Sequence, residues 1–139
     1  MPEFHRPSVS LRVASHDLVP EQLTALLGCK PSLRQSKGEV FPVTRGKKGR
    51  VAPIGVWILD APDRDSASLS EQIERLFVDL NPDLTVWSEL QNRYDVSVIC
   101  GIFMQSGIEG GDISPTASRM LADRGVRLQI DVYAGDPEE

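Results

Sequence analysis

A helical pattern of apolar residues between positions 69 and 80 places the strongest constraint on the fold of this chain. The apolar residues have the three- and four-residue spacing of one helix face: Leu69, Ile73, Leu76, Phe77 and Leu80. Ser68 and Glu71 stand at the spacing of a capping box, which predicts that the helix begins there. A helix with one apolar face has to bury that face against a second layer of structure.

Strand patterns near both ends of the chain are suited to supply that second layer. Val9, Leu11 and Val13 alternate with polar residues, which is typical of a half-buried strand. The last strand has the same period, and we expect one face of it to be buried: Val126, Leu128, Ile130 and Val132. Further strands are expected at residues 94–104 and at 39–44 and 55–60, the latter two joined into a hairpin by residues 45–50. The fold class that follows is α+β, with a mainly antiparallel sheet of about five strands and helices packed on one face.

The two ends of the chain also resemble each other. Asp17 and Asp112 each stand three residues before a proline, Pro20 or Pro115, that suits the first turn of a helix. If this similarity is a repeat, the chain contains two pseudo-duplicated β-α-β halves.

Length and composition are typical of one globular domain. We expect residues 1–139 to form a single domain, with about 1–7 and 134–139 as flexible tails. Apolar residues make up 40% of the chain and charged residues 25%, and the N-terminus lacks the pattern of a secretory signal. The two cysteines have no disulfide or metal spacing, so they predict reduced thiols and a cytoplasmic protein. No apolar run is long enough to cross a bilayer, so we expect no contact with the membrane.

A basic segment stands out from an acidic chain. Residues 30–50 have a net charge of +6, whereas the whole chain has −5. The basic residues at its tip are candidates for binding an anionic partner: Arg45, Lys47, Lys48 and Arg50. The alternative is a solvated hairpin tip whose charges keep a sheet edge from aggregating. The acidic chain and the single aromatic of this segment, Phe41, argue against nucleic acid as a partner.

No pattern of catalytic residues is recognisable. The two histidines have no partners at metal-ligand spacing, and no nucleophile elbow, phosphate-binding loop or dinucleotide fingerprint is present. The sequence therefore predicts no metal site and no cofactor, and it favours a function without catalysis.

The order of several short motifs resembles a bacterial family labelled domain of unknown function 4279. The motifs are Leu-x-Pro-Glu-x-Leu-Thr-x-Leu-Leu-Gly at 18–28, Lys37-Gly38-Glu39, Gly55-Val56-Trp57, Gln72-Ile73, Tyr94-Asp95, Leu121-x-x-x-Gly125 and Asp131-Val132-Tyr133. The resemblance covers about residues 8–133. It implies a small stand-alone module of unassigned activity, and it supplies no catalytic residues.

Two further groups of residues are candidates for function. Trp57, Tyr94 and Asp95 could line a polar-aromatic pocket for a small molecule or substrate, although both aromatics would also suit the core. The polar face of the last strand is either solvated or an interface, and its residues are Arg127, Gln129, Asp131 and Tyr133. The function that we favour is a small binding or protein-interaction module whose partner is another protein or, in a homodimer, itself. The alternative is a small-molecule binder or enzyme with a pocket near Trp57, Tyr94 and Asp95.

Overall fold

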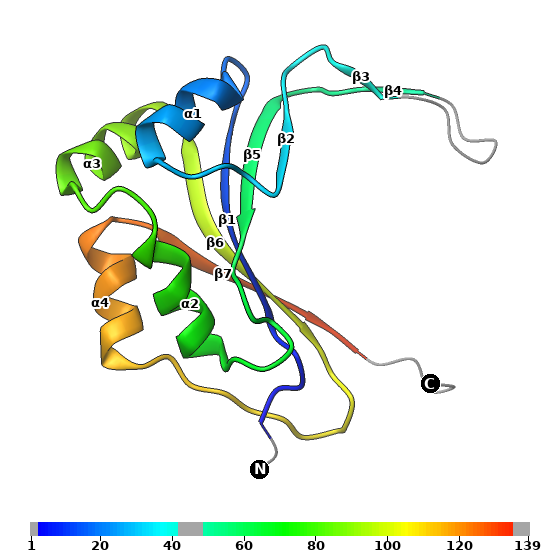
Figure 1. The fold of residues 1–139 in the computed structure, drawn as a ribbon. Helices are drawn as coiled ribbons and strands as arrows, with labels where there is room; N and C mark the ends of the chain where they lie inside the picture. The colour runs from blue at the N-terminus through cyan, green and yellow to red at the C-terminus, as the bar shows by residue number, and fades with distance from the viewer. Residues whose placement is uncertain (1–2, 42–48, 135–139) are drawn as a thin grey trace.

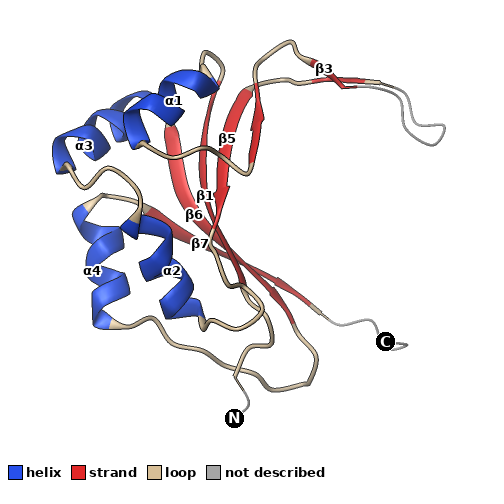
Figure 2. Cartoon of the chain, in the orientation of Figure 1, coloured by secondary structure: helices blue, strands red, loops and turns tan. Residues whose placement is uncertain are grey.

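The computed structural model describes residues 3–41 and 49–134, which form a layer of helices packed on a sheet (Figure 1). The helices are α1 (Pro20–Leu27), α2 (Leu69–Val78), α3 (Leu84–Arg93) and α4 (Pro115–Asp123). The main sheet contains β1 (Ser8–Ser15), β2 (Leu33–Gln35), β5 (Gly55–Asp60), β6 (Asp95–Phe103) and β7 (Arg127–Tyr133). A separate pair is formed by β3 (Val40–Phe41) and β4 (Arg50–Val51). All four helices lie on one side of the sheet (Figure 2), so the predicted fold class is confirmed.

The main sheet has the order β2-β5-β1-β6-β7, and only its last pair, β6 and β7, is parallel. Val13 in β1 lies opposite Trp57 in β5 and Val96 in β6, and these three side chains are directed towards the helices. The next residue, Ala14, lies opposite Val56 and Asp95 on the other face, because successive strand residues point to opposite sides. We call that other side the helix-free face.

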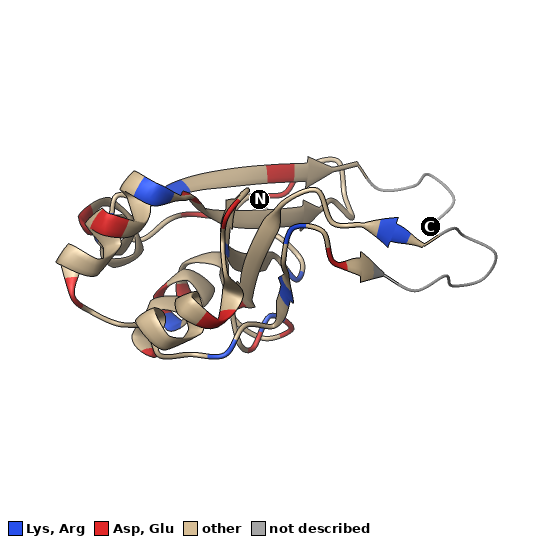
Figure 3. Ribbon diagram, turned by 90° about the horizontal axis from the view of Figure 1, so that it is seen from above, with Lys and Arg blue, Asp and Glu red and all other residues tan. Residues whose placement is uncertain are grey.

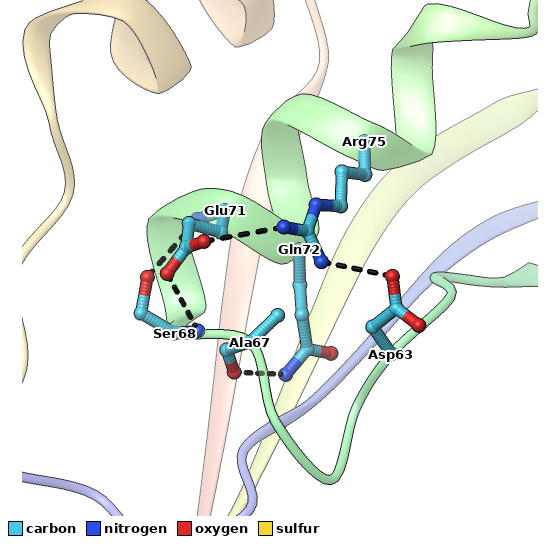
Figure 4. Close-up of polar contacts among 6 residues, drawn as sticks. All are labelled: Asp63, Ala67, Ser68, Glu71, Gln72 and Arg75. Atoms are coloured by element: carbon cyan, nitrogen blue, oxygen red, sulfur yellow. Dashed lines mark hydrogen bonds and ion pairs between the residues drawn. The ribbon is translucent and has the colours of Figure 1, made fainter.

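The helix predicted from residue 69 packs on β1 and places its apolar stripe in the core. Leu69, Ile73, Leu76 and Phe77 are all at most 5% exposed. The Ser68 hydroxyl accepts a hydrogen bond from the Glu71 backbone, and the Glu71 carboxylate accepts one from the Ser68 backbone, as Figure 4 shows. This capping box satisfies two backbone donors that the first turn leaves free, and it fixes where the helix starts.

A buried amide connects this helix to the beginning of β1. Gln72 is fully buried, and its Nε2 donates to the carbonyls of Pro7 (2.6 Å) and Ala67 (3.1 Å). Its Oε1 accepts from the backbone N–H of Val9 at 3.3 Å. Three buried backbone groups are thereby satisfied by one side chain, which is what their removal from water requires.

Two β-α-β units are present, as the similarity of the chain ends predicts. Pro20 and Pro115 both lie at the start of their helices, α1 and α4. In the second unit β6 and β7 are direct neighbours, whereas in the first unit β5 lies between β1 and β2. The halves are therefore similar in element order and different in strand pairing.

Two predictions about strands were wrong. Residues near 40 pair with β4 and not with 55–60, because Gly55–Asp60 is occupied on both sides by β1 and β2. The last strand is also less buried than its apolar period predicts, since Ile130 is 51% exposed and Val132 is 59% exposed. The helix beside that strand is too short to cover it: nine helical residues span about 13.5 Å, and seven strand residues span about 23 Å.

Candidate functional site

The structure separates the three residues that were candidates for one pocket. Trp57 is fully buried on the helix side, where its Nε1 donates to the Thr24 hydroxyl at 3.1 Å. Tyr94 is 8% exposed and belongs to the same core, with the Arg93 guanidinium 4.9 Å from its ring centre. Asp95 lies on the helix-free face, opposite Ala14. Because the sheet lies between Trp57 and Asp95, the three residues do not line a common pocket.

The basic segment lies mostly outside the described residues. Arg45, Lys47 and Lys48 are among these, so their role stays a prediction. Arg50 is described, and it lies exposed in β4 opposite Phe41. Over the described elements basic and acidic residues are interspersed on helices and strands alike (Figure 3).

The four residues proposed as an interface do share one face. Arg127, Gln129, Asp131 and Tyr133 follow β7 at alternate positions on the helix-free face. Two guanidinium groups converge on the Asp95 carboxylate, Arg127 at 2.8 Å and Arg12 at 3.8 Å. Gln129 donates from Nε2 to Asp131 at 3.2 Å. These polar groups are already paired with each other, so this part of the face is largely neutral.

An exposed aromatic pair lies at the far end of the same face. Phe103 and Tyr133 stack with ring centres 4.8 Å apart and ring planes 13° from parallel. Phe103 is nevertheless 57% exposed and Tyr133 50% exposed. Exposed aromatics of this kind are typical of protein interfaces, in which they supply a large apolar contact area.

Apolar exposure continues around the edge of the sheet. Ile130 and Val132 point from β7 to the helix side, beyond the part that α4 covers, and β7 has a neighbour on one side only among the described strands. Figure 1 shows this end of β7 running away from the helices. We call Phe103, Ile130, Val132, Tyr133 and the unpaired edge of β7 the β7 margin. Sequence periodicity placed Tyr133 correctly on the polar face of the last strand but assigned Ile130 and Val132 to the core. Comparing the expected length of the last helix with that of the last strand would have exposed the error.

The titratable groups with shifted pKa values have local structural causes. A hydrogen bond from the Ser15 hydroxyl lowers the pKa of Asp17, and the Ser68 backbone lowers the pKa of Glu71. The Ser106 and Gln105 backbones lower the pKa of Glu109. Burial raises the pKa of the Cys100 thiol to about 11, which keeps it protonated and unreactive. Each of these three carboxylates accepts hydrogen bonds from nearby hydroxyl or backbone groups, which favours its charged form.

Within residues 3–41 and 49–134, no three His, Cys, Asp or Glu side chains are arranged to hold a metal ion. None of the helices found there is long and apolar enough to span a membrane. A groove of about 480 Å³ lies between α1 and β2. Its wall includes Thr24, Lys30 and the ion pair between Glu21 and Arg34, whose atoms are 3.1 Å apart.

The fold and these surfaces define a two-layer α+β domain in which the described helices all lie on one sheet face and the β7 edge exposes apolar side chains. The chain belongs to the family described as domain of unknown function (DUF4279), whose model matches residues 2–135. No curated protein and no solved structure gave a match.

Proposed function

We propose that this domain is a protein-interaction module without catalytic activity, and that it binds its partner through the β7 margin. The observation that carries the proposal is the exposure of four large apolar side chains around one strand. Two of them, Phe103 and Tyr133, are stacked on the helix-free face, and Ile130 and Val132 lie on the other face. Contiguous exposed apolar patches on soluble proteins commonly mark binding sites.

The edge of β7 supports the same proposal. Natural proteins usually protect long sheet edges with lysine, proline, a bulge or a covering segment. β7 has seven residues and includes neither lysine nor proline, its charged residues Arg127 and Asp131 are already paired on the helix-free face, and no described strand pairs with its outer edge. The other edge strand, β2, has only three residues. An edge of this kind is suited to accept a strand from a partner, with backbone hydrogen bonds for affinity and side-chain contacts on both faces for specificity.

The test is capture of partners with two matched variants of the full chain. Val132→Lys puts a charge in the β7 margin, and Leu33→Lys puts the same charge on an exposed apolar residue of the opposite edge. After cross-linking in a cell extract and mass spectrometry, wild type and Leu33→Lys should retain the same bound protein, including further copies of the chain, and Val132→Lys should lose it. Equal capture by all three proteins, or capture by none, would contradict the proposal.

The groove between α1 and β2 supports a second candidate, the binding of a small organic anion. Lys30 and Arg34 supply positive charge, and the Thr24 hydroxyl lies in the wall, where it accepts from Trp57. Concave sites with a few placed polar groups are typical of ligand binding. Native mass spectrometry should then detect a retained small molecule that is lost in Arg34→Glu and kept in the control Arg64→Glu. The absence of a retained molecule that depends on Arg34 would remove this candidate.

A further inference from the structure

The backbone of β7 presents a regular row of hydrogen-bonding groups along its outer edge. The Tyr133 carbonyl accepts from the Met104 backbone at 2.9 Å, so the backbone groups of Tyr133 face β6. In a strand the N–H and C=O of one residue point to the same side, and this side alternates from residue to residue. Arg127, Gln129 and Asp131 therefore also bond towards β6. The outward groups belong to Leu128, Ile130 and Val132.

We propose that the occupant of this edge is a second copy of the chain, paired antiparallel through β7 about a two-fold axis at Ile130. This inference rests on the proposed function, of which it names the partner. Ile130 would lie opposite the Ile130 of the other copy, and Leu128 opposite Val132. Those are the residues with outward backbone groups, so each donates and accepts one hydrogen bond across the axis. Two five-stranded sheets become one continuous sheet.

The side chains of β7 complement themselves in this register. On the helix side every cross-strand pair is apolar, namely Ile130 with Ile130 and Leu128 with Val132. On the helix-free face Gln129 lies opposite the Asp131 of the other copy. An amide and a carboxylate are compatible neighbours, and within one chain the Gln129 amide already donates to Asp131. Arg127 lies opposite Tyr133, a pairing of a guanidinium with an aromatic ring. No like charges face each other, and this is what a two-fold contact requires of a single strand.

Other registers of the same strand are less complementary. An axis at Asp131 would put two carboxylates opposite each other, which is destabilising. An axis at Gln129 would pair Leu128 with Ile130, but Val132 would lie opposite Val126, whose N–H already bonds to the Leu121 carbonyl at 2.9 Å. The register centred on Ile130 uses all three outward residues and covers both exposed aliphatic side chains.

The deciding experiment is sedimentation equilibrium on the full chain over a series of protein concentrations. Wild type should move from 15.3 kDa towards twice that mass as concentration rises. Ile130→Lys places two ammonium groups at the axis and should raise the dimer dissociation constant on the order of tenfold or more. The control Leu33→Lys replaces a residue of similar exposure, 53% against 51%, and should dimerise as wild type does. A wild type that stays monomeric throughout, or an Ile130→Lys variant that dimerises normally, would overturn the proposal.

A third variant tests the register. In Gln129→Lys each new ammonium group would lie opposite an Asp131 carboxylate, so the dimer should be as tight as wild type or tighter. With an axis at Gln129 the two ammonium groups would face each other, so a weaker dimer would overturn the register proposed here. A monomeric wild type whose capture of another protein is lost in Val132→Lys would refute self-pairing and keep the proposed function. If neither self-association nor such capture occurs, the proposed self-pairing and the proposed function are both refuted.

Discussion

Replacing the buried amide of Gln72 by a carboxyl group should make the stability of this protein depend on pH. Gln72→Glu keeps the shape of the side chain but removes the NH₂ group that donates to the Pro7 and Ala67 carbonyls. An ionised carboxyl there would face two carbonyl oxygens without a hydrogen to offer either of them. The protonated form is therefore favoured, and burial adds to this preference because it disfavours charge.

The size of the effect follows from the hydrogen bonds and from proton linkage. A protonated carboxyl has one O–H, so one carbonyl loses its donor, at a cost of about 1–3 kcal/mol. The introduced carboxyl has a pKa of about 4.3 in the unfolded chain, and full burial can raise the folded value by about 3–5 units. Between these two values the folded state keeps a proton that the unfolded state has released, so stability falls as pH rises, by about 1.4 kcal/mol per unit. From pH 5.5 to 7.5 the variant should lose about 2–2.7 kcal/mol more relative to wild type, the smaller loss belonging to the lower end of this range of folded pKa values.

Urea unfolding followed by tryptophan fluorescence measures this difference at each pH. Gln22→Glu is the matched control, because Gln22 is exposed on α1 and the same substitution there should leave the free energy of unfolding nearly unchanged at every pH. A deficit for Gln72→Glu that is below about 1 kcal/mol, or that does not change with pH, would refute the reasoning.

Three other substitutions or reactions probe the core. Phe77→Ala should lower the free energy of unfolding by about 3–5 kcal/mol, because it removes a ring that is 2% exposed and packs edge-on against Trp87; a loss under about 1 kcal/mol would mean that α2 is peripheral. Gly55→Ala should cost about 1–3 kcal/mol, since a Cβ there would lie 2.7 Å from the Leu18 carbonyl oxygen, whereas Gly107→Ala meets nothing and should be neutral; equal effects in urea unfolding would contradict this. An aromatic disulfide reagent should label Cys29 alone in the native protein and both thiols in urea, because Cys100 is fully buried with a raised pKa; rapid native labelling of both would contradict the packing around β6.

Local patterns in the sequence predicted the helices well. The stripe after Ser68 and the prolines at 20 and 115 define helix faces and starts through interactions within a few residues, so they do not depend on the rest of the fold. The order of motifs also identified the family, although it gave no information about a site.

Predictions that depend on how distant segments meet were weaker. Trp57 and Asp95 lie on opposite sides of the sheet because of the registers of β1 with β5 and β6, which periodicity within one strand cannot define. The pairing of residues near 40 with β4 was missed for a related reason, since β1 and β2 occupy both sides of β5. The exposure of Ile130 and Val132 depends on where α4 ends relative to β7. The sequence predicted that Arg127, Gln129, Asp131 and Tyr133 share one face, but the exposed apolar side chains on the other face of β7 became apparent only with the helix layer in place.

Residue-resolved amide hydrogen exchange tests most directly whether the edge of β7 is a binding edge. Arg127, Gln129, Asp131 and Tyr133 bond towards β6 and should be protected at all protein concentrations. Leu128, Ile130 and Val132 point outward and should exchange fast in dilute protein, then become protected as the concentration rises and β7 pairs with a second copy. The predicted result is this alternating, concentration-dependent protection, lost in Ile130→Lys and kept in Leu33→Lys. Fast exchange of the three outward amides at every concentration would contradict the account.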